Sequence, residues 1–314
     1  MNLLRKIARA LAALSIALGG NAIARTPEGA AAPPTVAVPA VADTDAPERR
    51  SGPALWKVAD KDTTVYLFGT VHALPPELEW MDDNISKALH GSDVLITEIP
   101  MEGASSLDPA VLKMAMLPPE KTLRGMMNDD DRAAYEKAMA SLSLPAAAFD
   151  KLEPWYAALM LSTMPLMRDG YGPDSGVEAV LEKAFGPERP RGALETVDYQ
   201  LGLFDTLPIP TQLDYLRQVS DNVEDMKPKL DAMIAAWLAG DADELGKLIN
   251  DDETDPALVE RLLTQRNRNW AAWIEKRMET PGTVFVAVGA GHLAGESSVQ
   301  AILRDDGIEA ERVQ

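Results

Sequence analysis

The chain of 314 residues contains no cysteine and only 3 histidines. The absence of cysteine excludes disulfide bonds, thiol catalysis, and zinc or iron–sulfur sites built on thiolate ligands. Because histidine is so scarce, the position of each histidine bears directly on the catalytic or metal-binding chemistry available to the chain.

Basic residues are few compared with acidic ones. The chain has 30 Lys and Arg against 49 Asp and Glu, which gives a net charge of −19. Nucleic-acid binding depends on Lys and Arg to displace counterions, so we expect no nucleic-acid partner. The hydrophobic fraction of 46% and charged fraction of 25% are typical of a globular protein and exclude a wholly disordered chain.

No hydrophobic run is long enough to span a bilayer, and the apolar run near the N-terminus predicts a secretion signal. Three basic residues precede the apolar stretch Ala10–Leu18, and Ala22-Ile23-Ala24 forms an A-x-A cleavage site. We therefore predict a signal peptide over residues 1–24, a bacterial periplasmic or secreted location, and no stable membrane insertion after cleavage. Residues 25–53 are rich in Ala and Pro and predict a disordered tether before a domain at residues 54–314.

Strand–helix–strand patterns are expected at both ends of this domain. Short runs of β-branched and aromatic residues predict strands, and they are separated by helix-like segments. The predicted elements are strand Thr63–Phe68, helix Met81–Leu89, strand Val94–Thr97, a short strand at Gly192–Leu194, strand Thr283–Val288, helix Glu296–Leu303 and strand Ile308–Val313. The spacing indicates βαβ units.

The segment between these ends, residues 103–280, is expected to be mostly helical. An N-cap and Pro pair at Asp108-Pro109 and a capping box at Ser175–Glu178 mark helix starts. Further helices are predicted at Asp130–Ala140, Pro154–Met167, Thr211–Asn222, Pro228–Ala239, Ala242–Leu248 and Pro256–Met278. The predicted fold class is therefore α/β, with a central mixed sheet divided by a large helical insertion.

Two of the three histidines follow predicted strands after glycine-containing turns. Residues 69–72 read Gly-Thr-Val-His, and residues 289–292 read Gly-Ala-Gly-His. Glu98 and Glu195 also come directly after predicted strands. Because ligands of open α/β sheets bind at the carboxyl ends of the strands, we expect these side chains to converge on one crevice.

Two histidines and one carboxylate form a typical ligand set for a catalytic metal with an open water position. We predict that His72, Glu98 and His292 hold a divalent ion such as Mn, Co or Zn. Glu195 is the candidate general base on the bound water or a residue that supports a metal ligand, and Arg266 is the candidate for steadying an oxyanion. Each side chain also has a structural interpretation, as a hydrogen-bonded turn residue, a cap or an ion-pair member. The third histidine, His90, is expected to lie at a helix C-terminus.

At these residues the sequence resembles the TraB/GumN family, part of the Tiki-like superfamily. The matching stretches are Leu55-Trp56-Lys57-Val58, Val65 through His72, Thr97-Glu98-Ile99, Leu194-Glu195-Thr196 with Gln200, Arg266-Asn267, and Val288 through Leu293. The resemblance covers residues 54–314. It implies a fold like those of Tiki, erythromycin esterase and ChaN proteins, with a shared site formed by the two histidines, Glu98 and an Arg.

The superfamily includes divalent-metal-dependent peptidases, esterases that cleave macrolide lactones, and haem-binding proteins. The resemblance therefore leaves the reaction open. The favoured hypothesis is an exported, metal-dependent hydrolase acting on a peptide or protein bond. The alternatives are a metal-independent, esterase-like hydrolase in which a histidine activates water, and a protein that binds a small molecule such as haem without turnover. Substrate and oligomeric state stay open.

Overall fold

The computed structural model describes residues 52–100, 109–250 and 256–314. The predicted signal peptide, most of the predicted tether and Asp108 lie outside the described residues. Within the described ranges, none of the helices combines the length and the apolar character needed to cross a membrane.

A six-stranded mixed sheet forms the centre of the fold, in the order β4-β3-β5-β2-β1-β6. The strands are β1 (Leu55–Ala59), β2 (Thr63–Thr70), β3 (Val94–Thr97), β4 (Arg191–Ala193), β5 (Gly282–Gly289) and β6 (Glu311–Arg312). β5 pairs in parallel with both β2 and β3, although more than 180 residues separate it from either along the chain. The register sets Thr70 opposite Gly289 and Thr97 opposite Ala287, so these three strands end together at one edge.

The predicted α/β fold with a mixed sheet is confirmed, with differences at the C-terminal end. β3 has the predicted bounds, and β2 and β5 extend slightly beyond theirs. The last strand is shorter than predicted: β6 holds only Glu311 and Arg312, because the chain meets β1 only there, opposite Lys57 and Trp56. The preceding helix, α13 (Val299–Asp305), begins later than predicted.

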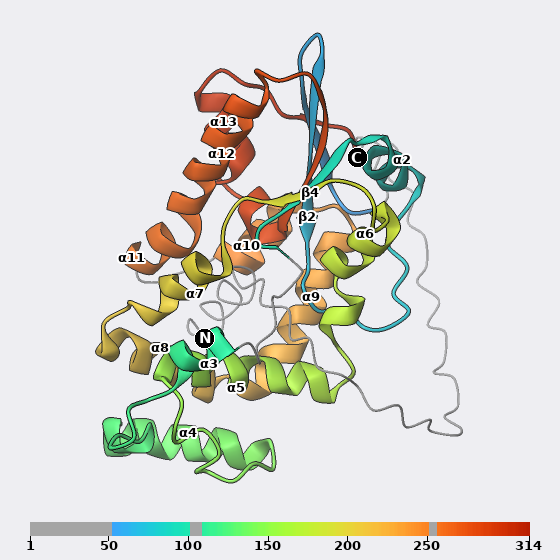
Figure 1. Ribbon diagram of the computed structural model, residues 1–314. Helices are drawn as coiled ribbons and strands as arrows, with labels where there is room; N and C mark the ends of the chain where they lie inside the picture. Colours follow the sequence, from blue (N-terminus) through green and yellow to red (C-terminus); the bar gives the residue numbers. More distant parts are fainter. Residues whose placement is uncertain (1–51, 101–108, 251–255) are drawn as a thin grey trace, which may run out of the picture.

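Helices cover both faces of the sheet, and the alternation of side chains along β2 decides which helices each face contacts. Phe68 faces a core shared with α2 (Asp83–Gly91), α6 (Val177–Phe185), α9 (Met226–Leu238) and α10 (Ala242–Asn250). Leu67 faces the opposite core, shared with α12 (Gln265–Arg277) and α13. Figure 1 shows α12 and α13 on one side of the sheet and α2 and α6 on the other.

The predicted helical insertion forms two further cores, separate from the two that cover the sheet. Helices that contribute to these two cores are α3 (Pro109–Ala115), α4 (Asp129–Ser141), α5 (Pro154–Arg168), α7 (Val197–Asp205) and α8 (Ile209–Asp221). Figure 1 shows α4 and α5 at the end of the molecule away from β1 and α13. The helix predicted over Pro256–Met278 is divided into α11 (Pro256–Val259), a π-helical turn at Glu260–Thr264, and α12.

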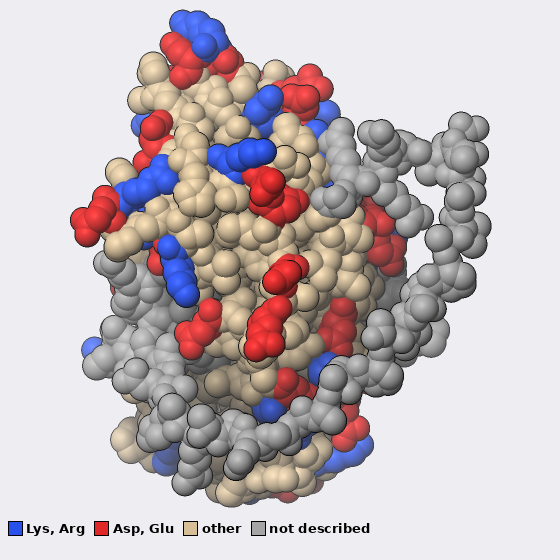
Figure 2. Space-filling view, turned by 90° about the vertical axis from the view of Figure 1, so that its right-hand side faces the viewer, with Lys and Arg blue, Asp and Glu red and all other residues tan. Residues whose placement is uncertain are grey.

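Charged side chains do not gather by sign on the face drawn in Figure 2. Acidic and basic groups are interspersed there over a largely uncharged surface. The described part of that face therefore offers no large patch of one sign for a charged partner.

Candidate functional site

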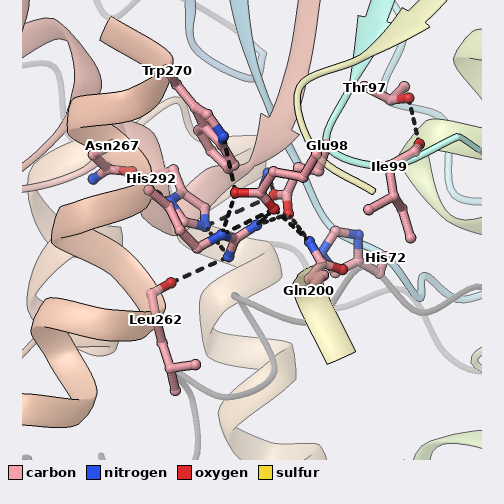
Figure 3. Close-up of polar contacts among 12 residues, drawn as sticks. His72, Thr97, Glu98, Ile99, Gln200, Leu262, Asn267, Trp270 and His292 are labelled. Atoms are coloured by element: carbon pink, nitrogen blue, oxygen red, sulfur yellow. Dashed lines mark hydrogen bonds and ion pairs between the residues drawn. The ribbon is translucent and has the colours of Figure 1, made fainter. Parts of the chain in front are cut away.

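Arg266, the second residue of α12, lies at the centre of a buried polar network (Figure 3). Its guanidinium Nη2 donates to Glu98 Oε2 at 2.5 Å and to Glu195 Oε2 at 2.8 Å. Nε donates to Glu195 Oε1 at 2.9 Å, and Nη1 donates to His292 Nε2 at 3.1 Å. The side chain of Arg266 is 0% exposed, so the network holds a buried cation between two carboxylates and an imidazole.

The π-helical turn before α12 contributes to the placement of Arg266. Arg266 Nη1 also donates to the carbonyl of Leu262, a residue within that turn. π-Turns within helices occur often at functional sites, where they redirect a side chain. Arg268, two residues further on, is half exposed and pairs with Glu260, so it takes no part in the network.

Glu98, at the end of β3, is held ionised. Its Oε1 accepts from the backbone N–H of Gly289 at 2.6 Å, and its Oε2 accepts from Gln200 Nε2 at 2.9 Å as well as from Arg266. Burial alone would raise the pKa of this carboxyl. The positive charge of Arg266 and the Gly289 hydrogen bond outweigh burial and hold the pKa at about 2. Glu98 therefore carries a negative charge over the whole physiological range.

Glu195 follows β4 and is the second carboxylate that Arg266 binds. Its backbone N–H donates to the Glu98 carbonyl at 2.7 Å, which fixes the two glutamates next to each other. Its Oε1 also accepts from Trp270 Nε1 at 3.1 Å, and its Oε2 accepts from Gln200 Nε2 at 3.2 Å. Both carboxylate oxygens are thus engaged by donors inside the fold.

His292 lies in the short 3₁₀ turn Ala290–Leu293 that follows β5, and it is 0% exposed. Its Nδ1 is 2.5 Å from Asn267 Oδ1, so Nδ1 carries the proton and donates, while Nε2 accepts from Arg266. The indole ring of Trp270 packs against the imidazole, with 4.3 Å between ring centroids. Burial, assisted by the charge of Arg266, lowers the pKa of His292 to about 3, so the ring is neutral.

His72 has a different environment, although its turn has the same spacing. Its Nδ1 lies 2.5 Å from Glu178 Oε1, and the side chain is 18% exposed. Burial lowers the pKa of His72, but the carboxylates of Glu178 and Glu98 outweigh burial and raise it above its usual value. Figure 3 shows His72 and His292 on opposite sides of Glu98. The two imidazoles are therefore electrostatically linked through one carboxylate.

Glu178 reaches His72 because α6 begins directly against the His72 turn. The backbone N–H of Val177 donates to the Val71 carbonyl at 3.0 Å. A Cβ added to Gly176 would overlap the carbonyl of His72, so this close approach requires glycine.

The predicted capping box at Ser175–Glu178 is wrong. α6 begins after Gly176, and Ser175 Oγ donates instead to the Leu74 carbonyl at 2.6 Å. Glu178 contacts His72 rather than the helix start, so the motif that predicted a local cap supplies a long-range contact.

His72 lines a pocket of about 900 Å³, measured out to its open mouth. The walls come from α5, α9 and α10, together with the turns that follow β2 and β5. Most of the lining side chains are aliphatic or Met, which is typical of a small-molecule site. The arrangement can bind an apolar group beside a histidine whose proton affinity is raised.

The predicted metal ligands lie close together, but their donor atoms are directed at other partners. His292 uses both ring nitrogens, and both oxygens of Glu98 accept hydrogen bonds. Among the described residues, no group of three or more His, Asp or Glu side chains has an arrangement that holds a metal ion. In this geometry the guanidinium of Arg266 supplies the positive charge between the two carboxylates.

Four residues of the site are not predicted from the sequence as site residues. The sequence pattern predicts a helix cap at Glu178 and no function for Gln200, Asn267 and Trp270. One available signal was helical spacing, because residues 266, 267 and 270 share one face of a helix. His90 lies in the last turn of α2 as expected, with its Nδ1 2.7 Å from the Ser86 carbonyl, and is not a member of the network.

Comparison with known proteins identifies the family. The model of the TraB/PrgY/gumN family matches residues 54–312, which include every residue of the network. This chain belongs to the TraB/PrgY/gumN family.

Curated proteins of three bacteria are similar to this chain over most of its length. An uncharacterised protein of Treponema pallidum (strain Nichols) is 22% identical over 271 residues, covering 79% of this chain and 79% of its own. The uncharacterised protein YbaP of Escherichia coli (strain K12) is 24% identical over 246 residues, covering 76% of this chain and 87% of its own. A protein of the same description from Shigella flexneri is similar to the same extent. No solved structure matches the chain significantly.

Proposed function

We propose that this member of the TraB/PrgY/gumN family is a hydrolase in which His72, oriented by Glu178, acts as the general base on a water molecule. The observation that carries the proposal is the 2.5 Å contact between His72 Nδ1 and Glu178 Oε1 at the wall of an apolar pocket. In this proposal Nδ1 faces the carboxylate of Glu178, and Nε2 takes the proton from water. Carboxylate–histidine pairs of this kind fix the tautomer and stabilise the imidazolium.

The buried network supports this role through charge and position. Glu98 stays ionised, and its charge contributes to the raised pKa of His72. A base whose pKa lies near the operating pH is effective in proton transfer. We assign Glu98, Glu195, Arg266 and His292 to positioning, because each is engaged with the others and none lines the pocket.

A metal-dependent hydrolase is the second candidate function. A divalent ion held by His72, Glu98 and His292 would supply Lewis-acid activation of water. The donor atoms of Glu98 and His292 are directed at Arg266, Asn267 and Gly289, so the contacts favour the metal-independent form. Glu195 as the base and Arg266 as an oxyanion partner belong to the metal-dependent form.

The decisive experiment measures turnover on panels of esters and short peptides before and after exhaustive dialysis against EDTA. We expect hydrolysis that survives chelation and falls at least about 100-fold in His72→Asn. His90→Asn is the matched control, because His90 is exposed on α2 and the hydrogen bonds of its ring stay within that helix.

Other outcomes select the rival hypotheses. Activity lost on chelation and restored by Mn²⁺, Co²⁺ or Zn²⁺ supports the metal-dependent peptidase and overturns the role given to His72 alone. Absence of turnover together with a co-purifying chromophore such as haem supports a ligand-binding protein.

We further propose that the protein acts outside the cytoplasm, as a periplasmic or secreted protein. The signal-like residues 1–24 support this proposal. Sequencing the N-terminus of protein recovered from a periplasmic fraction should give Arg25 first. Recovery in the cytoplasm with Met1 intact would overturn it.

A further inference from the structure

Three hydroxyl groups line the pocket beside His72, and two of them have partners. Thr163 Oγ1 donates to the Leu159 carbonyl at 3.1 Å, within its own helix. Tyr171 donates to Asp231 in a short hydrogen bond. The third hydroxyl, that of Thr70, has no hydrogen-bond partner among the described residues.

The lack of a partner is unusual for a hydroxyl as buried as that of Thr70. The residue is 3% exposed and is the last residue of β2, on the same face of the strand as Phe68. Thr63, at the other end of this strand, donates to the carbonyls of Met278 and Thr280. Buried hydroxyls are normally satisfied, and one that is not costs stability in the protein alone. An unsatisfied group that lines a pocket therefore indicates a ligand atom that it binds.

The rest of the pocket is apolar. Its walls include Leu166 of α5, Leu230 and Met233 of α9, and Leu245 and Ile249 of α10. Thr70 and His72 line it from the end of β2 and the turn that follows, and Ala290 and Gly291 line it from the turn after β5. A ligand that matches both the apolar walls and the polar groups has an apolar chain. It also has a hydrogen-bond acceptor next to the bond that is cleaved.

We propose that the substrate is a carboxylic ester or amide with an apolar acyl group, bound with its chain in this pocket and its carbonyl oxygen on the Thr70 hydroxyl. This inference rests on the proposed hydrolase function. Water adds to the carbonyl carbon and gives its proton to His72 Nε2, while Thr70 Oγ–H stabilises the oxyanion. The bond to the leaving group then breaks, and His72 returns the proton to the departing oxygen or nitrogen, which yields a carboxylic acid and an alcohol or amine.

The first test separates the hydroxyl from the shape of Thr70. Thr70→Val removes only the hydroxyl, and Thr70→Ser retains it. We expect Thr70→Val to lower kcat on p-nitrophenyl decanoate at least about tenfold, with a melting temperature equal to or above that of the wild type. Thr70→Ser should retain most of the activity. Unchanged kcat in Thr70→Val, or a loss of activity that follows a loss of stability in both variants, overturns the role of the hydroxyl.

The second test measures occupancy of the pocket without turnover. Sodium decanoate is titrated into the full-length protein by calorimetry and compared with acetate. Thr163→Phe narrows the pocket, and Met164→Phe is the control on the same helix, because Met164 does not line it. We expect decanoate to bind the wild type and Met164→Phe at least about tenfold more tightly than Thr163→Phe, with acetate showing no such difference.

The two tests distinguish failure of this inference from failure of the proposed function. Decanoate binding that depends on residue 163, without any hydrolysis, supports the apolar subsite and overturns the proposed hydrolase function. Hydrolysis that is equally fast for acetyl and decanoyl esters and insensitive to Thr163→Phe supports the hydrolase and overturns the acyl pocket.

Discussion

The two glycine-containing turns that end in histidine share a spacing and differ in almost everything else. His292 is fully buried, has both ring nitrogens engaged and has a pKa lowered to about 3. His72 is partly exposed, lines a pocket and has a raised pKa because Glu178 and Glu98 face it. The repeated turn therefore fixes the backbone position of each histidine, and side chains from other elements determine the pKa and the contacts of its imidazole.

The largest effect should come from removing the cation at the centre of the buried network. Arg266→Met leaves Glu98 and Glu195 ionised without their partner, and we expect a loss of about 3–5 kcal/mol in the free energy of unfolding. Arg268→Ala, an exposed arginine on the same helix, should change stability by less than about 1 kcal/mol. Urea denaturation of the two variants measures both values. Equal effects would contradict the role given to Arg266.

The network should also make stability depend on pH through Glu98. Its pKa of about 2 in the folded state lies below the ordinary value of 4.5, so ionised Glu98 favours folding above pH 4.5. This contribution, on the order of 3 kcal/mol, is lost as the pH falls from 4.5 toward 2. The stability gap between the wild type and Glu98→Gln should therefore be widest at neutral pH and narrow in acid. A gap that stays constant from pH 7 to pH 3 argues against the assignment.

Matched substitutions at the two histidines should separate stability from activity. Asparagine can replace the Nδ1 donor of either ring but not Nε2. His292→Asn leaves Arg266 Nη1 without its acceptor and opens space beside Trp270, which should cost about 2 kcal/mol. His72→Asn should cost less than about 1 kcal/mol and yet abolish hydrolysis, because its side chain lies at the pocket wall. Thermal unfolding and turnover are measured on both variants. A larger loss of stability in His72→Asn than in His292→Asn, with hydrolysis retained in His72→Asn, would refute the prediction.

The smallest effect concerns the pH profile of the proposed hydrolysis. Activity requires deprotonated His72, so it rises with pH through the pKa of His72. Glu178→Gln removes the charge that does most to raise this pKa, and the acidic limb should move to lower pH. Glu182→Gln, one helical turn further along α6, should leave the limb unchanged. A shift in the opposite direction, or the same shift in both variants, contradicts the pairing of His72 with Glu178.

Much of the fold could be predicted from the sequence because its signals are local. Runs of β-branched residues marked β2, β3 and β5 closely, and helical periodicity located α4 and α5. The bounds of β6 could not be predicted from local signals, because its length depends on where the chain meets β1.

The candidate site was predictable in its position and not in its partners. Side chains at the ends of parallel strands were expected to converge, and Glu98 and His292 do so because β5 lies between β2 and β3. Spacing cannot tell a carboxylate that binds a metal from one that binds an arginine. Glu178 is the clearest example, because its capping-box spacing is local while its contact with His72 depends on the packing of α6.

The difference in pKa between His72 and His292 can be measured by an NMR titration of the histidine side chains. Because the chain has only 3 histidines, ¹³C-labelled histidine gives three ring signals, which His90→Asn and His72→Asn assign. We predict that the His72 signal titrates with a midpoint above 6.5, and that the His292 signal stays at its neutral position from pH 5 to pH 9. Titration of His292 within that range, with His72 unchanged, would contradict the account.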